Sequence, residues 1–183
     1  MRAWMIASLA SVAAVSALAQ GVHPGGPGRA DMGKQVYQKA NCVGCHKWHG
    51  GGGGGYGGAA LSLRATSLDR EQIVEIVDCG RPGTGMPYHK RGAYDGTGCY
   101  GLSREELGKD IPIEGVTFLR PAEVEAVADY VLTHFKGRGE PTYAECEAFF
   151  GAGARACRQY QAAETPEAHQ SASQATPQGG PTR

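Results

Sequence analysis

Five consecutive residues constrain this chain more than any other feature: Cys42-Val43-Gly44-Cys45-His46. Two thiols stand three positions apart, and an imidazole follows the second thiol directly. A single turn of backbone therefore presents two sulfur atoms and one nitrogen atom to the same neighbouring group. Whatever the chain folds into has to accommodate a group that uses all three.

The pattern CxxCH is the attachment signal for c-type haem. The thiols of Cys42 and Cys45 add to the two vinyl groups of the porphyrin, and His46 reaches the iron. Two other interpretations are a disulfide between the two cysteines and half of a zinc site. A zinc site needs further ligands at suitable spacing, and the sequence contains no second CxxC and no HxxxH. The motif occurs once, so the sequence predicts one covalently attached haem c.

The first 19 residues have the features of a secretory signal peptide. Arg2 is followed by an alanine-rich apolar run that ends in the small residues Ala17 and Ala19. We expect cleavage before Gln20. The alternative is an uncleaved membrane anchor, but the run is short and its alanines are only weakly apolar. The sequence thus predicts a soluble periplasmic protein with no stable membrane insertion after cleavage.

Composition divides the rest of the chain. Residues 20–29 are rich in glycine and proline and are expected to form a flexible leader. Residues 161–183 contain almost no large apolar side chain, which predicts a disordered tail. Between them we expect one domain over residues 30–137 and a helical hairpin extension over residues 138–160. The formal net charge is +0, and a nucleic-acid partner is excluded because it would need a basic surface.

Apolar periodicity predicts an all-α fold. Segments 30–40 and 121–135 repeat apolar residues at helical spacing, and Pro121 is suited to the first turn of the second segment. Ser67 is expected to cap a helix over residues 68–78, and Ser103 with Glu106 forms a capping box for a short helix. Residues 143–160 are expected to form a hairpin that breaks at residues 151–153. No run alternates in the way a strand requires.

The second axial ligand of the iron is expected to be Met86. This methionine lies between Gly85 and Pro87, in a loop punctuated by glycine and proline. A methionine on a core helix usually fills space, but Met86 belongs to no predicted helix. His89, three residues further on, is the alternative ligand.

These features resemble the class I c-type cytochromes over residues 30–137. The resemblance is carried by Cys42, Cys45 and His46 after a short helix, by the loop at Met86, and by the helix over residues 121–135. It implies a small all-α domain in which the first and last helices cross beside one haem. Gly33, Tyr37 and Tyr130 match the small and aromatic residues of that crossing. The stretch between Met86 and Pro121 is longer than the simplest members need.

Four further cysteines are Cys79, Cys99, Cys146 and Cys157. In an exported protein, spare thiols tend to pair. Three pairings are possible, and the sequence alone does not choose among them. Joining nearest neighbours is the most economical, and it would staple the C-terminal hairpin. A thiol redox pair is the alternative, but these cysteines lack CxxC spacing.

With both axial positions filled by protein, the iron has no open site for a substrate. The sequence therefore predicts a one-electron carrier, not an enzyme, between a donor dehydrogenase and an acceptor oxidase or reductase. The alternatives are a haem peroxidase with a labile distal ligand, and a non-catalytic cytochrome subunit or haem sensor in a larger complex. Aromatic and basic residues after Met86 are expected to form part of the docking surface. They are Tyr88, His89, Lys90, Arg91, Tyr94 and Tyr100.

Overall fold

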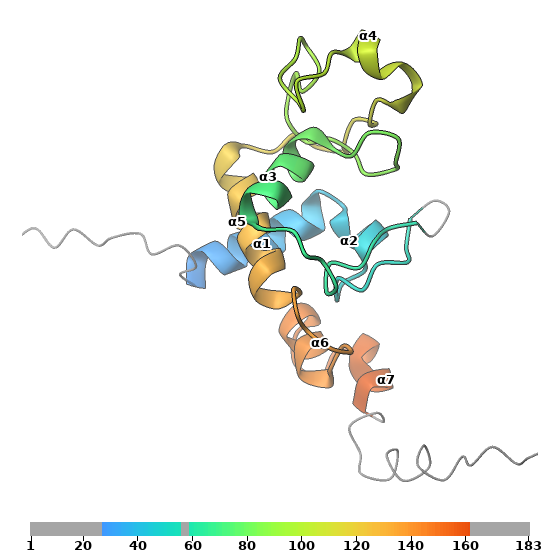
Figure 1. Ribbon diagram of the computed structural model, residues 1–183. Coiled ribbons are helices and arrows are strands. Elements are labelled where there is room, and N and C mark those ends of the chain that lie inside the picture. Colours follow the sequence, from blue (N-terminus) through green and yellow to red (C-terminus); the bar gives the residue numbers. More distant parts are fainter. Residues whose placement is uncertain (1–26, 56–58, 162–183) are drawn as a thin grey trace, which may run out of the picture.

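The computed structural model describes residues 27–55 and 59–161 (Figure 1). The predicted signal peptide, most of the predicted leader and residues 162–183 of the predicted tail lie outside these ranges. Within them the chain is helical and has no strand, apart from isolated bridges between Tyr88 and Glu114 and between Cys99 and Leu102. The elements are α1 (Pro27–Lys39), α2 (Cys42–His46), α3 (Arg70–Cys79), α4 (Arg104–Leu107), the 3₁₀ helix η2 (Gly108–Asp110), α5 (Pro121–His134), α6 (Tyr143–Phe150), the 3₁₀ helix η3 (Arg155–Cys157) and α7 (Arg158–Gln161).

Helices α1 and α5 cross at the centre of the molecule (Figure 1). Val36 and Tyr37 of α1 pack with Val127 and Val131 of α5 in the main hydrophobic core. The rings of Tyr37 and Tyr130 lie 5.8 Å apart. Helix α3 adds Ile73 and Val77 to the same core. The crossing of the first and last helices implied by the resemblance is therefore present.

Gly33 permits the close approach of α1 to α5. A Cβ atom at this position would lie 2.3 Å from the carbonyl oxygen of Ala126 and 2.6 Å from Cβ of Tyr130. A backbone carbonyl within a helix has little freedom to move away. We expect Gly33→Ala to lower the free energy of unfolding by about 3 kcal/mol, measured by guanidinium denaturation. Gly28→Ala in the same helix is the control, since nothing lies within 4 Å of a Cβ there. Equal stability of the two variants would contradict the close packing.

Two predicted helix starts differ from the structure. Helix α1 begins at Pro27, three residues before the predicted start, because proline is well suited to the first turn of a helix. The N-cap of α3 is Asp69, so the prediction of Ser67 is wrong. The Asp69 side chain accepts a hydrogen bond from the amide of Gln72, whose side chain accepts one from the Asp69 amide, each at 2.9 Å. This reciprocal pair satisfies two amides that a helix start leaves free.

The segment between α3 and α5, residues 80–120, has a hydrophobic core of its own. We call this segment the excursion. Tyr88, Ala93 and Tyr94 are buried there with the Cys79–Cys99 disulfide. His89 is also buried, with 2% of its surface exposed. The prediction of a docking surface is therefore wrong for Tyr88, His89 and Tyr94, whereas Tyr100 is partly exposed. The excursion is long enough to bury its own apolar residues, and the disulfide closes it.

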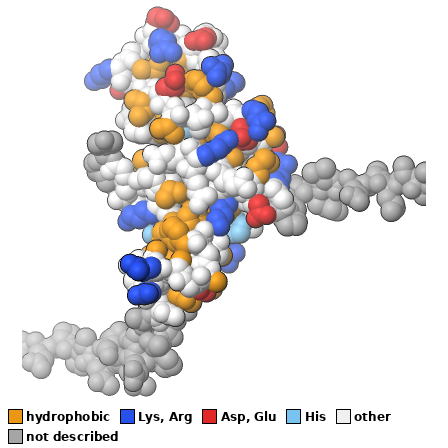
Figure 2. All heavy atoms as spheres, turned by 180° about the vertical axis from the view of Figure 1, so that it is seen from behind, with side chains coloured by type: hydrophobic (Ala, Val, Ile, Leu, Met, Phe, Trp, Pro, Cys, Tyr) orange, Lys and Arg blue, Asp and Glu red, His pale blue; other side chains and the backbone are white. Residues whose placement is uncertain are grey.

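The charged residues of the predicted docking surface do lie at the surface. Lys90 and Arg91 are exposed. Arg91 lies over the ring of Phe118, with 4.4 Å between the guanidinium carbon and the ring centre. Figure 2 shows acidic and basic side chains interspersed on the visible face at this end of the molecule. That face therefore does not carry charges of one sign only.

The C-terminal extension lies at the opposite end from the excursion (Figure 1). Helix α6 starts at a capping box formed by Thr142 and Glu145, and the chain turns at Gly151. A disulfide joins Cys146 to Cys157. Both disulfides connect nearest neighbours in sequence, which is the pairing expected as most economical. Among the described helices, none is both long and apolar enough to cross a membrane.

Candidate haem site

The CxxCH motif forms a helix of one turn, α2. Left-handed backbone conformations bracket it, at Asn41 with φ of 60° and at Lys47 with φ of 62°. Asparagine adopts this conformation readily, whereas lysine does so at some cost. The buried hydroxyl of Tyr37 donates a hydrogen bond to the carbonyl oxygen of Lys47 at 2.8 Å. Helix α1 thus fixes the backbone directly after His46.

The ring of His46 is held by a backbone carbonyl. Its Nδ1 lies 2.9 Å from the carbonyl oxygen of Leu61, so Nδ1 carries the proton and donates it. The other ring nitrogen, Nε2, is then the unprotonated one. Burial lowers the pKa of His46 below its ordinary value, which favours the neutral ring. A neutral imidazole with one nitrogen anchored is the form that binds a metal.

Cys42 and Cys45 are free thiols, while the other four cysteines form the two disulfides. Burial raises the pKa of the Cys42 thiol to about 12. The CxxC motifs of thiol oxidoreductases have the opposite property, a lowered pKa that supplies a thiolate. Within the described residues, no group of three or more potential metal-binding side chains is present.

The glycine run after the motif closes over α2. The amides of Gly52, Gly54 and Gly55 donate to the carbonyl oxygens of His46, Cys45 and Gly44, at 3.2, 3.0 and 3.1 Å. A Cβ on Gly54 would lie 2.6 Å from the Cys45 carbonyl oxygen. The run is therefore an ordered part of the structure around α2. It satisfies the carbonyls that a one-turn helix leaves free.

The C-terminal extension packs against the residues that follow His46. The ring of Trp48 lies 6.0 Å from Phe149 and 5.3 Å from Tyr160. Arg64 is buried, and its guanidinium donates to the carbonyl oxygen of His49 at 3.0 Å and to Glu145 at 3.1 Å. One arginine thus joins the segment after the motif to the start of α6. No motif in the sequence marks this role of Arg64.

Met86 lies in the loop that follows α3, whereas the other three candidate residues lie on α2. The loop closes on itself: the Arg81 amide donates to the Met86 carbonyl oxygen at 3.1 Å. The hydroxyl of Thr84 accepts from the Met86 amide at 3.2 Å and donates to the Arg81 carbonyl oxygen at 2.7 Å. We call residues 81–86 the methionine loop. The Met86 side chain is partly exposed.

His89, the alternative ligand, is fixed inside the excursion. Its Nδ1 lies 2.8 Å from the carbonyl oxygen of Thr117. A Cβ on Gly115 would lie 2.5 Å from the ring, so the backbone packs directly on the imidazole. Its amide also donates to the carbonyl oxygens of Val77 and Asp78, both at 3.1 Å. These contacts give His89 a structural role that ties α3 to the excursion.

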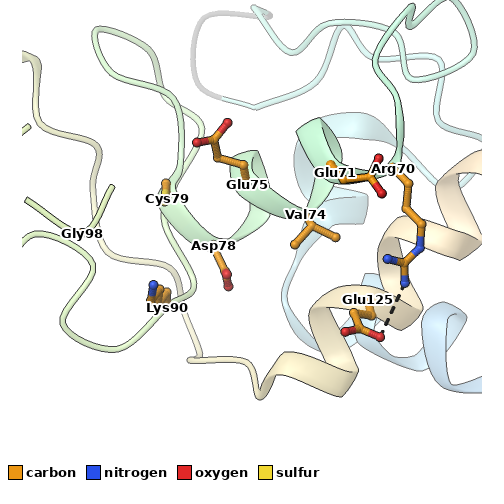
Figure 3. Close-up of a pocket in the computed structure, with 9 residues that line it drawn as sticks. All are labelled: Arg70, Glu71, Val74, Glu75, Asp78, Cys79, Lys90, Gly98 and Glu125. Atoms are coloured by element: carbon orange, nitrogen blue, oxygen red, sulfur yellow. Dashed lines mark hydrogen bonds and ion pairs between the residues drawn. The ribbon is translucent and has the colours of Figure 1, made fainter. Parts of the chain in front are cut away.

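A hollow of about 320 Å³ on the outer side of α3 does not suit a porphyrin (Figure 3). Four carboxylates line it, from Glu71, Glu75, Asp78 and Glu125, and Glu125 pairs with Arg70 at 3.5 Å. The ring of a haem is apolar and needs apolar neighbours. The one cysteine there, Cys79, is already bonded to Cys99.

Comparison with known proteins agrees with the geometry of α2. Residues 28–97 match the family model described as "Cytochrome C oxidase, cbb3-type, subunit III". The matched span includes the CxxCH turn and the methionine loop. No curated protein and no solved structure matches the chain. The match spans less than half of the chain and supports a cytochrome c domain over residues 28–97, a type of domain that implies covalently bound haem c.

Proposed function

We propose that this chain is an exported cytochrome with a single haem that carries one electron at a time in the periplasm. Its donor would be a dehydrogenase and its acceptor an oxidase or reductase. The observation that carries the proposal is the geometry of α2: two free thiols and an imidazole on one turn, with Nδ1 bonded to Leu61 and Nε2 available. Export of residues 20–183 after cleavage of residues 1–19 belongs to the same proposal.

Four residues would hold the haem. Cys42 and Cys45 form the two thioether bonds, and His46 is the proximal ligand. Met86 is the distal ligand, which is supported by its position in a closed loop and by the structural contacts of His89. When bound, the haem supplies reversible one-electron exchange between ferric and ferrous iron.

The chain contributes rigidity to this exchange. Tyr37 holds the backbone after His46, and Leu61 orients the ring. The methionine loop closes on itself through Thr84. If the fold holds both His46 and Met86, the site would change little between the two oxidation states, so the reorganisation energy would be small. Ligation by both residues would leave no free position at the iron for external ligands or peroxide.

A subunit role is the second candidate function, and the family match favours it. The family model describes a subunit of a cytochrome c oxidase. The chain would then pass electrons within a larger assembly. The excursion and the extension lie at opposite ends of the described chain (Figure 1), and each would offer such an assembly a separate contact surface.

The test is to express the full chain in cells that export and mature c-type cytochromes. We expect the ferric protein to show the sulfur–iron absorption band at the red end of the spectrum. The ferrous protein should not bind carbon monoxide, and a redox titration should fit one electron. Rapid binding of carbon monoxide together with peroxide turnover would contradict the carrier and favour a peroxidase. Co-purification with membrane oxidase subunits would favour the subunit role.

A further inference from the structure

The methionine loop is attached to the end of α3. The Arg81 amide donates to the Met86 carbonyl oxygen at 3.1 Å. Gly80, with φ of 68°, ends the helix, and a Cβ there would lie 2.8 Å from the same Met86 oxygen and 2.7 Å from Cβ of Pro112. Any movement of the backbone at Gly80 therefore moves the loop.

Two tyrosine hydroxyls bond to the backbone at this point. Tyr94 donates to the carbonyl oxygen of Cys79, and Tyr100 donates to that of Gly80, both at 2.6 Å. Carbonyls at the end of a helix have no partner within the helix. Side chains from the excursion thus satisfy two consecutive carbonyls next to the loop that carries the distal ligand.

The excursion is built to hold these tyrosines in place. The Cys79–Cys99 disulfide fixes the residue before Tyr100 against the end of α3. Tyr100 itself has φ of 55°, a conformation that a tyrosine adopts only when its surroundings impose it. Tyr94 is buried and packs edge-on against Tyr88, with ring centres 5.6 Å apart. Burial raises the pKa of Tyr100 to about 12, so its hydroxyl remains a donor at neutral pH.

We propose that Tyr94 and Tyr100 are positioning residues for the distal ligand. Acting through the carbonyls of Cys79 and Gly80, they keep the methionine loop closed and set how slowly Met86 gives way to an external ligand. The proposal rests on the proposed function, in which Met86 binds the iron. It assigns the long excursion a role in holding the site, in addition to any role as a surface.

The test compares haem-loaded, full-length protein with Tyr100→Phe and Tyr94→Phe. Each change removes one hydroxyl and leaves a carbonyl without its partner. We expect imidazole to displace the sulfur–iron band about tenfold faster in Tyr100→Phe, because opening of the loop becomes easier. Amide hydrogen exchange should accelerate at Arg81 and Thr84, while the protection of α1 and α5 stays unchanged. This second measurement does not depend on the iron.

Tyr143→Phe is the matched control. Its hydroxyl donates to Glu147 within α6, in the extension, at 2.8 Å. It should leave both measurements as in the unmodified protein. Displacement and exchange within about twofold of the unmodified protein in both test variants would overturn the proposal. If Tyr100→Phe does not load haem, Tyr94→Phe decides by the same two measurements. A sulfur–iron band that persists in Met86→Ala would instead overturn the role of Met86, and these two failures are distinguishable.

Discussion

Replacing Cys42 and Cys45 together with alanine is expected to abolish covalent attachment of haem. The two thiols are the only free cysteines among the described residues, so no other described sulfur is available for a thioether. Each single change should leave at most one thioether and weaken attachment. Intact mass checks this directly. The unmodified exported protein should have the mass of residues 20–183 plus one haem, less the hydrogens lost in the two disulfides.

The control for this experiment changes the same residue type elsewhere. Cys146 and Cys157 form the disulfide of the extension, whose sulfurs take no part in the proposed site. Replacing both with serine should lower stability by about 3 kcal/mol and leave the haem in place. An exported protein without haem in its mass would refute the assignment of a c-type cytochrome. Retention of covalent haem by the double alanine variant would refute the assignment of the thioethers.

Local sequence signals predict the features that depend on residue type within a short segment. CxxCH, the capping box at Ser103, and Pro121 at a helix start are short patterns, and each reports contacts made within a few residues. The capping box and the helix start are present as predicted. The helical core of α1, α3 and α5 was also predictable, because apolar spacing follows from which face of a helix is buried.

The anchoring contacts were not predictable because they use backbone atoms far away in sequence. His46 is held by the carbonyl of Leu61, and a carbonyl is present on every residue. Arg64 joins His49 to Glu145, which are 15 and 81 residues away from it. No pattern in one sequence marks such a pair. The contacts of Arg64 become evident only when the structure shows that the extension packs against the residues after the CxxCH motif.

The excursion shows how an aromatic composition misleads. Tyr88, Tyr94 and Tyr100 have the composition of a docking surface, and tyrosine is common at interfaces. A buried tyrosine is equally favourable when its hydroxyl finds an acceptor. Here all three hydroxyls donate a hydrogen bond. The acceptors are the carboxylate of Glu114 and the carbonyl oxygens of Cys79 and Gly80. Composition does not distinguish tyrosines at an interface from tyrosines buried inside the segment. A disulfide that closes the segment favours burial.

Met86→Ala is the change expected to alter the redox properties most. Removing the thioether leaves the proposed distal position without a protein ligand. The sulfur–iron band should disappear, and the ferrous protein should bind carbon monoxide readily. The reduction potential should fall by on the order of 100 mV, since the methionine no longer stabilises the ferrous state. Absorption spectra with and without carbon monoxide, together with a potentiometric titration, check all three results.

Met32→Ala is the matched control for that change. Met32 lies on α1, partly buried against the main core, where a methionine serves packing alone. Its loss should reduce stability and leave the band, the potential and the response to carbon monoxide as they are. A native spectrum and potential in Met86→Ala would transfer the ligand role to another residue. His89 would then have to leave the carbonyl of Thr117 and the backbone of Gly115, so its own replacement should both unfold the excursion and open the iron. Ligation by Met86 requires neither, because the methionine loop is already closed and Met86 is partly exposed.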